Sequence, residues 1–331
     1  MRRTSFHRPF NRIIAVYAAA LLLLPLWLVA HRQSVVRSAK AAFSSVSRAL
    51  QIGHAYAAIR DDSSSGLPVR DHEVIQKSFS LAGAARKSID IDNIWGSIEV
   101  VGDATDQVQL VVDKTTRAES KDALALAHKE VTLDITQPDG GLKLYVDGPF
   151  RCNCAGGCQG SRRRDDEGYI VKMDFVLHVP TNVDVKVKTV NEGRVIVRNV
   201  TGNFIARNVN GDIELDGMAG SGIARTVNGP VRATFRQNPR ENSNFQSVNG
   251  NIDLFFVHGL SADFRFKTFN GSVFSDFPVT TLPTHALSEE RHAGKVVYRS
   301  DRFTAGRVNA GGPEIQIENL NGDIRILESH E

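Results

Sequence analysis

Apolar and polar residues alternate through most of the chain after residue 74, as in β-strands that cover one face. The first alternating segments contain Ile89 and Ile91, Ile98 and Val100, Val108 and Leu110, Val131 and Leu133, and Leu142 and Leu144. Between them, residues 120–129 are rich in helix formers, and Ser120 is a good N-cap. The pattern predicts an all-β domain over residues 74–331, with one short helix inserted among the early strands.

The second half of this domain repeats one short motif, in which an apolar residue precedes Asn-Gly. The five copies are Asn210-Gly211, Asn228-Gly229, Asn249-Gly250, Asn270-Gly271 and Asn321-Gly322. Their glycines are 18, 21, 21 and 51 residues apart, and a period near 20 is typical of stacked structural units. The last interval is wide enough for one irregular or interrupted repeat.

Asn-Gly between alternating segments is also the strongest short signal for a β-hairpin, so an antiparallel meander is an alternative. However, Gly202 and Gly220 near the half period follow Thr and Ala, so two unlike corners alternate. This favours a β-solenoid-like stack of Val-Asn-Gly repeats, in which the asparagines form a hydrogen-bonded ladder. At such a corner, Gly tolerates positive φ and Asn tolerates the left-handed region.

The N-terminal part predicts a membrane anchor. Residues 13–30 carry no charge and would form a helix about 27 Å long, close to the thickness of the bilayer core. A short cytoplasmic head, 1–12, precedes this transmembrane helix. A juxtamembrane segment, 31–60, has the period of an amphipathic helix or of an extension of the anchor, and a linker, 61–73, follows it.

The sequence just after the anchor is a poor site for signal-peptide cleavage, so we expect the anchor to be retained. Basic residues flank the anchor on both sides and leave the positive-inside rule nearly tied. A short basic head before a long repeat domain favours a single-pass protein of the cytoplasmic membrane. Its C-terminal domain would then be periplasmic or extracellular.

The repeats Thr226-Val227-Asn228-Gly229 and Ser247-Val248-Asn249-Gly250, with the entry strand ending His178-Val179-Pro180, resemble the bacterial "putative adhesin" family. That family has a β-strand-repeat domain of unknown function behind an N-terminal membrane segment or signal. The resemblance runs from about Ile89 to Leu327. It implies a β-solenoid-like domain outside the cytoplasm. An insertion at 151–168 and a loop at 278–302 depart from a plain array of repeats.

Charge suggests one binding surface. The net charge of +3, from 40 basic and 37 acidic residues, is too near balance to indicate nucleic acid. Outward positions of the strands before each corner carry basic residues: Lys186, Lys188, Arg207, Arg225, Arg265 and Lys267, with Gln246 in series. Stacked at about 4.8 Å per strand, they would form a stripe for an anionic envelope polymer. Alternatively, they keep an exposed sheet soluble.

Three cysteines, Cys152, Cys154 and Cys158, fall within seven residues of the insertion. One disulfide would leave one thiol over, and a metal site would lack a nearby fourth ligand. A structural or incidental role, an intermolecular bond and a metal site therefore all stay open.

Catalytic patterns are missing from the sequence. It has no Gly-x-Ser-x-Gly, no His-Glu-x-x-His and no phosphate-binding loop. Glu214 and Asp253 are candidates for the catalytic acids of a polysaccharide-cleaving groove. Stacking does not gather acids around them, because their counterparts in other repeats are Arg232, Phe274 and Arg325. No cofactor is expected.

These features predict a non-catalytic, membrane-anchored envelope module that binds or builds structure, with the membrane and an anionic envelope polymer or a membrane protein as partners. An alternative is an accessory that senses envelope stress or a ligand and signals through a membrane regulator. A polysaccharide-active β-solenoid enzyme is a third hypothesis.

Overall fold

The computed structural model describes residues 66–83, 86–151, 168–283, 288–292, 295–299 and 303–329. The predicted anchor at 13–30, the segment at 31–60 and the three cysteines lie outside these residues. Within the part that the structure describes, no helix is long and apolar enough to cross a bilayer. The membrane anchor therefore stays a prediction.

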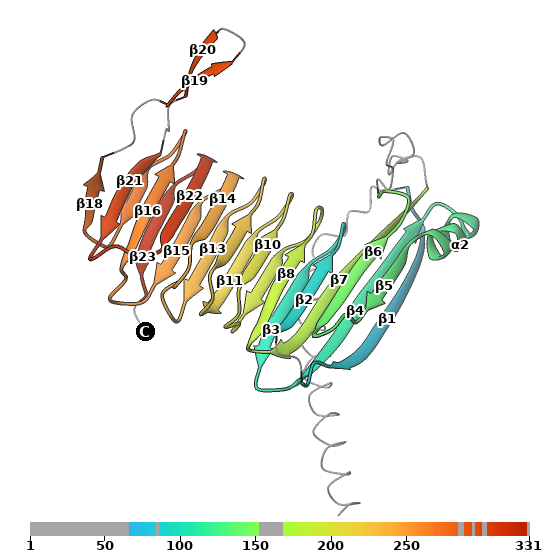
Figure 1. Cartoon of the computed structure of the whole chain (residues 1–331). Helices are drawn as coiled ribbons and strands as arrows, with labels where there is room; N and C mark the ends of the chain where they lie inside the picture. Colours follow the sequence, from blue (N-terminus) through green and yellow to red (C-terminus); the bar gives the residue numbers. More distant parts are fainter. Residues whose placement is uncertain are drawn as a thin grey trace, which may run out of the picture. The chain divides into compact units, whose positions relative to one another are not determined.

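Two large sheets form the domain, and we call them sheet A and sheet B (Figure 1). In spatial order, the ten strands of sheet A are β1 (Val69–Ser80), β4 (Gln107–Ala118), β7 (Tyr169–Pro180), β3 (Ile98–Asp103), β9 (Val195–Arg198), β11 (Ile213–Met218), β13 (Val231–Phe235), β15 (Ile252–Phe256), β23 (Ile324–Glu328) and β17 (Val273–Ser275). The eleven of sheet B are β18 (Val279–Leu282), β21 (Thr304–Val308), β16 (Ala262–Lys267), β22 (Glu314–Asn321), β14 (Ser243–Asn249), β12 (Gly222–Arg225), β10 (Phe204–Arg207), β8 (Val183–Lys188), β2 (Lys87–Asp92), β6 (Gly141–Asp147) and β5 (Thr132–Thr136).

The described helix, α2 (Lys121–Glu130), lies where its composition predicts it. The Ser120 hydroxyl accepts a hydrogen bond from the Ala123 N–H, so it satisfies one of the unpaired donors of the first turn. The predicted all-β class with one short helix is thus confirmed for the described residues. Strand β1 begins at Val69, inside the range expected as linker. Its backbone pairs antiparallel with β4 along twelve residues. The sequence pattern did not predict this strand, because few of its side chains are apolar.

Consecutive strands of the repeats belong to different sheets. Strand β10 pairs in parallel with β12 in sheet B, and β11 pairs in parallel with β13 in sheet A. Each Asn-Gly is therefore a corner at which the chain passes from one sheet to the other. The alternative of an antiparallel meander is wrong for the repeats, although β1, β4 and β7 do pair antiparallel at one end of sheet A.

The inward side chains of both sheets form one apolar core. Alternation along the strands identifies its members correctly, since Ile213, Leu215, Phe204 and Ala206 are all buried. Buried phenylalanines contact one another within it, and the rings of Phe235 and Phe256 stack with centroids 5.1 Å apart. Burial of such side chains contributes roughly 1.5–3 kcal/mol each, so the core dominates the stability of the stack.

The last repeat of the sequence is not the last repeat of the stack. Strand β22 lies between β14 and β16, and β23 lies between β15 and β17. The described residues within 276–313 leave the regular path between these repeats. They form β18 and β21, where β21 is antiparallel to β16, and the separate hairpin β19 (Ser288–His292) and β20 (Lys295–Arg299) (Figure 1).

The range 278–302, expected as a loop, thus contains the three short strands β18, β19 and β20. They depend on backbone pairing with β21 and with each other. Pairing of this kind does not need the alternating apolar face by which the other strands were predicted.

Candidate functional site: a basic row on sheet B

The corner glycines hold the repeats in register. A Cβ at Gly250 would lie 2.3 Å from the carbonyl oxygen of Gly229, and one at Gly211 would lie 2.1 Å from that of Gly193. Both distances are shorter than a real contact permits, so close stacking of the backbone requires glycine here. Positive φ, which glycine tolerates, occurs at the corners Gly229, Gly250 and Gly322 but not at Gly211 or Gly271.

The asparagine side chains at these corners donate to one another in a single direction. The Nδ2 of Asn228 donates to Oδ1 of Asn210 at 2.8 Å, and Asn249 donates to Asn228 at 2.7 Å. Asn321 then donates to Asn249 and accepts from Asn270, so it is an inner member of the series. We call this series the asparagine ladder. Its asparagines do not use the left-handed conformation that Asn tolerates: the described non-glycine residues with positive φ are Glu192, Asn199 and Asn309.

The ladder extends one step further than the repeated motif indicates. Asn210 donates to Oδ1 of Asn191 at 2.8 Å. Asn191 escapes the motif because Glu192, with φ of 54°, separates it from Gly193. Beyond Asn191, the corresponding position is Trp95, whose ring packs edge-on against Phe150 at 5.1 Å. In the sequence, both Asn191 and Trp95 follow an apolar residue and precede a nearby glycine, and this looser pattern could have identified them as corners.

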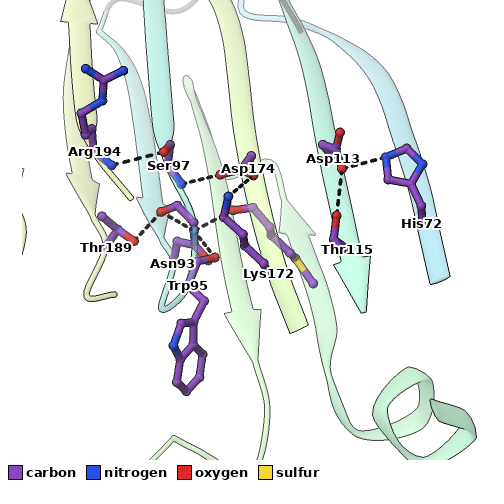
Figure 2. Close-up of polar contacts among 12 residues, drawn as sticks. His72, Asn93, Trp95, Ser97, Asp113, Thr115, Lys172, Asp174, Thr189 and Arg194 are labelled. Atoms are coloured by element: carbon purple, nitrogen blue, oxygen red, sulfur yellow. Dashed lines mark hydrogen bonds and ion pairs between the residues drawn. The ribbon is translucent and has the colours of Figure 1, made fainter. Parts of the chain in front are cut away.

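A second, buried polar series supports the corners from inside. The Thr189 hydroxyl donates to the Gly96 carbonyl at 2.8 Å, and Figure 2 shows this contact beside Asn93. Thr226 and Ser247 make the same contact with the corner glycine of the neighbouring repeat. Each repeat is therefore tied to the next through backbone carbonyls, which gives the outer faces a rigid and regular base.

On the outer face of sheet B, one row of side chains crosses the strands in register. Along the sheet, this row reads Asp92, Lys188, Arg207, Arg225, Gln246, Glu318 and Lys267. The continuous basic stripe expected from the sequence is therefore interrupted. Glu318 separates Lys267 from the rest because β22 inserts between β14 and β16. We call Lys188, Arg207 and Arg225 the basic row.

Four of the six predicted basic residues lie against acidic partners. Lys186 Nζ is 2.8 Å from Asp90, Lys267 Nζ is 2.9 Å from Glu318, and Arg265 is 3.7 Å from Glu314. Lys188 is 3.6 Å from Asp92, a carboxylate that also pairs with Arg151 at 2.8 Å. Sequence reasoning did not find these acids, because they come from strands far away in the chain.

Arg207 and Arg225 differ from the other four. Both side chains are exposed, and neither forms an ion pair with another residue that the structure describes. Arg225 Nε donates to Oδ1 of Asn244 at 3.1 Å, which orients the guanidinium and leaves its other donors free for a ligand. Two arginines thus lie side by side on neighbouring strands, next to Lys188.

Arg307, near the end of sheet B, shows how this fold neutralises an arginine. Its Nε and Nη2 donate to the two carboxylate oxygens of Asp263 at 2.6 and 2.8 Å. The hydrogen bonds from Arg307 hold the pKa of Asp263 below its ordinary value of 3.8. Among the residues that the structure describes, neither Arg207 nor Arg225 has such a partner.

Other polar contacts are structural. His72 Nε2 lies 2.9 Å from Oδ1 of buried Asp113 and ties the edge strand β1 to β4 (Figure 2). Lys172 pairs with Asp174, which also accepts from the Ser97 N–H. Glu214 and Asp253, considered above as catalytic acids, lie 3.4 Å from Arg198 and 3.5 Å from Arg325. Within the described ranges, no group of three His, Cys, Asp or Glu could hold a metal.

Comparison with known proteins gives distant similarities. No family model matches the chain, and no curated protein matches it. A "putative cell adhesion protein" from Clostridium sporogenes is 11% identical, with 78% of this chain and 100% of that chain covered at a TM-score of 0.34. A "putative adhesin" from Bacteroides fragilis is 13% identical, with 78% and 97% covered at 0.34. A "putative lipid binding protein" from Parabacteroides distasonis is 11% identical, with 78% and 97% covered at 0.25.

Proposed function

We propose that the protein is a non-catalytic binding module whose basic row holds an anionic polymer of the cell envelope. The observation that carries this proposal is the pair Arg207 and Arg225, exposed, in register and without an acidic neighbour on either strand. A guanidinium binds carboxylate or phosphate through two parallel hydrogen bonds, so adjacent arginines suit a ligand with repeated anionic groups.

The unliganded pair carries an energetic cost. Like charges directly opposite on neighbouring strands destabilise a sheet, by roughly 0.2–1 kcal/mol per pair. An anion bound across the pair would remove this repulsion. The backbone beneath it is already ordered by parallel pairing and by the corner hydrogen bonds, so little further ordering is needed on binding.

The remaining elements of the proposal concern architecture and location. We propose a β-solenoid-like arrangement of the repeats, supported by parallel, in-register strands that alternate between the two sheets. We also propose that residues 13–30 anchor the chain in the cytoplasmic membrane, with the β domain outside the cytoplasm. The uncharged run in the sequence supports this anchor.

Binding by the full chain in detergent micelles tests the function. The probe is an immobilised acidic polysaccharide, compared with a neutral one of similar length. The double variant Arg207→Gln with Arg225→Gln should bind at least about tenfold more weakly, since each charge-assisted hydrogen bond contributes roughly 1.5–3 kcal/mol.

The matched control replaces two exposed arginines outside the basic row, Arg194→Gln with Arg236→Gln. It removes the same net charge and should keep most of the affinity. Equal losses in the two double variants would show that only net charge matters, and the proposed site would be wrong.

Location has a separate test in intact cells. A membrane-impermeant thiol reagent should label Cys152, Cys154 or Cys158 once the outer barrier is permeabilised, and lysis should add little. Labelling that appears only after lysis would place the domain in the cytoplasm and contradict the proposed location.

A further inference from the structure

We infer that the ligand of the basic row is a polyuronate, an acidic polysaccharide with one carboxylate on each sugar ring. This inference rests on the proposed function and specifies its ligand. Three cations on successive strands recur every ~4.8 Å, the spacing of hydrogen-bonded neighbours in a sheet. One sugar ring along an extended chain advances the chain by a similar length. Neighbouring rings of such a chain turn relative to each other, and the long side chains of Lys188, Arg207 and Arg225 can each reach one carboxylate.

Other polyanions fit this spacing less well. In a polyphosphate chain, the charges follow one another more closely than the strands do. In a polymer of glycerol phosphate units, they lie further apart. The parallel sheet fixes the spacing of the three backbones, so a ligand with a different period requires the Lys and Arg side chains to bend away from their own strands.

A neighbouring row on the same face also favours a sugar. Two positions before Arg207 and Arg225 on their strands lie Ile205 and Ile223, which pair in register and are partly exposed. Asn244 continues this row and orients Arg225. A pyranose ring offers apolar C–H groups as well as hydroxyls, so it can cover these side chains and keep its carboxylate toward the arginines.

Acidic side chains limit the length of the site. Asp92 precedes Lys188 in the row, and Glu318 follows Gln246, so a carboxylate placed at either end meets a like charge. Gln246 is neutral and can bind a hydroxyl. The basic row therefore accommodates three successive charges, and longer chains extend past it without further gain.

Calorimetric titration of the full chain in micelles with oligogalacturonates of defined length tests this inference. Affinity should rise steeply up to the trimer, by about tenfold from dimer to trimer for one more charge-assisted contact, and then stay level. Methyl-esterified oligomers, which keep the sugar backbone and lose the charges, should bind about as weakly as neutral chains. Polyphosphate of equal charge should bind more weakly than the trimer.

A variant that gains affinity is the most decisive test, because an unfolded variant cannot bind more tightly. Glu318→Gln removes the acid at the end of the row and frees Lys267, which lies 2.9 Å from it. In this variant, affinity should keep rising for oligomers longer than the trimer. Glu314→Gln is the control, since it removes an acid that lies 3.7 Å from Arg265 in the neighbouring row and should leave the length dependence unchanged.

The outcomes separate the inference from the function on which it rests. If polyphosphate binds as tightly as the oligogalacturonates and still depends on Arg207 and Arg225, the row binds anions and the polyuronate is wrong. The polyuronate is also wrong if affinity does not depend on oligomer length, or if Glu318→Gln leaves the length dependence unchanged. If no polyanion shows dependence on the two arginines, the proposed function itself fails.

Discussion

One row of side chains on the outer face of each sheet differs in its order of charges, although the same repeats build both faces. On sheet A, one row reads Glu214, Arg232, Asp253 and Arg325, so each arginine is registered against a carboxylate. On sheet B, Lys188, Arg207 and Arg225 follow one another without an acid between them. Regular stacking by itself therefore does not produce a basic row. The repeat sets the positions, and the residue chosen at each one decides whether charges cancel or accumulate.

What the two faces share is the corner that joins them. The corner glycines, the asparagine ladder and the buried hydroxyls keep both sheets in register at once. Damage to the corner should therefore disturb both faces, whereas changes on one face should leave the other intact.

The largest expected effect is at a corner glycine. Gly250→Ala would place a Cβ 2.3 Å from the Gly229 carbonyl oxygen, so the two repeats must move apart. We expect a loss of about 2–3 kcal/mol, as for overpacked cores, seen as a lower thermal midpoint by circular dichroism. Both faces should be affected, including anion binding on sheet B.

Gly66→Ala is the control for this variant, since a Cβ there meets nothing within 4 Å. Its midpoint should equal that of the native chain. A Gly250→Ala variant that is as stable as this control would show that the close stacking at the corner is not required.

The next effect compares two members of the asparagine ladder. Asn321 both donates and accepts, whereas Asn270 donates only to Asn321 in the ladder. At roughly 0.5–1.5 kcal/mol per hydrogen bond, Asn321→Ala should cost about twice as much as Asn270→Ala in denaturant unfolding. If the repeats stacked in sequence order, Asn270 would be the inner member and the ranking of the two variants would be reversed.

Replacing an arginine by glutamate should change the stability of the fold in opposite directions on the two faces. Arg232→Glu would place three acids side by side on sheet A and remove the contact of the guanidinium with the Phe255 ring. It should destabilise by about 1–2 kcal/mol. Arg207→Glu would place an acid between Lys188 and Arg225, and it should stabilise by up to about 1 kcal/mol while abolishing polyanion binding.

Melting temperatures of the two variants at low salt check this pair. High salt should shrink both shifts, because mobile ions screen exposed charges. A destabilised Arg207→Glu variant would mean that Arg207 has a structural partner, and the contrast between the faces would then be lost.

The smallest effect concerns an arginine of sheet B that does have a partner. Asp263 has a pKa lowered by its hydrogen bonds from Arg307, so its ionised form stabilises the fold above its unfolded pKa. That stability is lost as the pH falls through the lower folded pKa. Asp263→Asn should therefore flatten the decline in melting temperature below about pH 4. The control, Asp139→Asn on an exposed turn, should keep the native acid-side slope.

Much of the fold was predictable because it depends on local pattern. Period-two alternation identified the inward residues, and the composition of residues 120–129 identified the helix with its Ser120 cap. Strand β1 and the strands within 278–302 were missed, since their identity depends on partners rather than on an apolar face. Asn191 was missed because one inserted residue hides the motif.

By itself, the sequence determined the repeat, its two unlike corners, the residues that face the core and the positions that carry basic side chains. These features follow from side-chain periodicity and from the backbone needs of glycine, both of which are local. Only the tertiary structure decided the order of the repeats and hence the neighbours of each charge. Insertion of β22 between β14 and β16 brought Glu318 into the basic series. Because charges act through space, a residue distant in the chain defined the limit of the binding row.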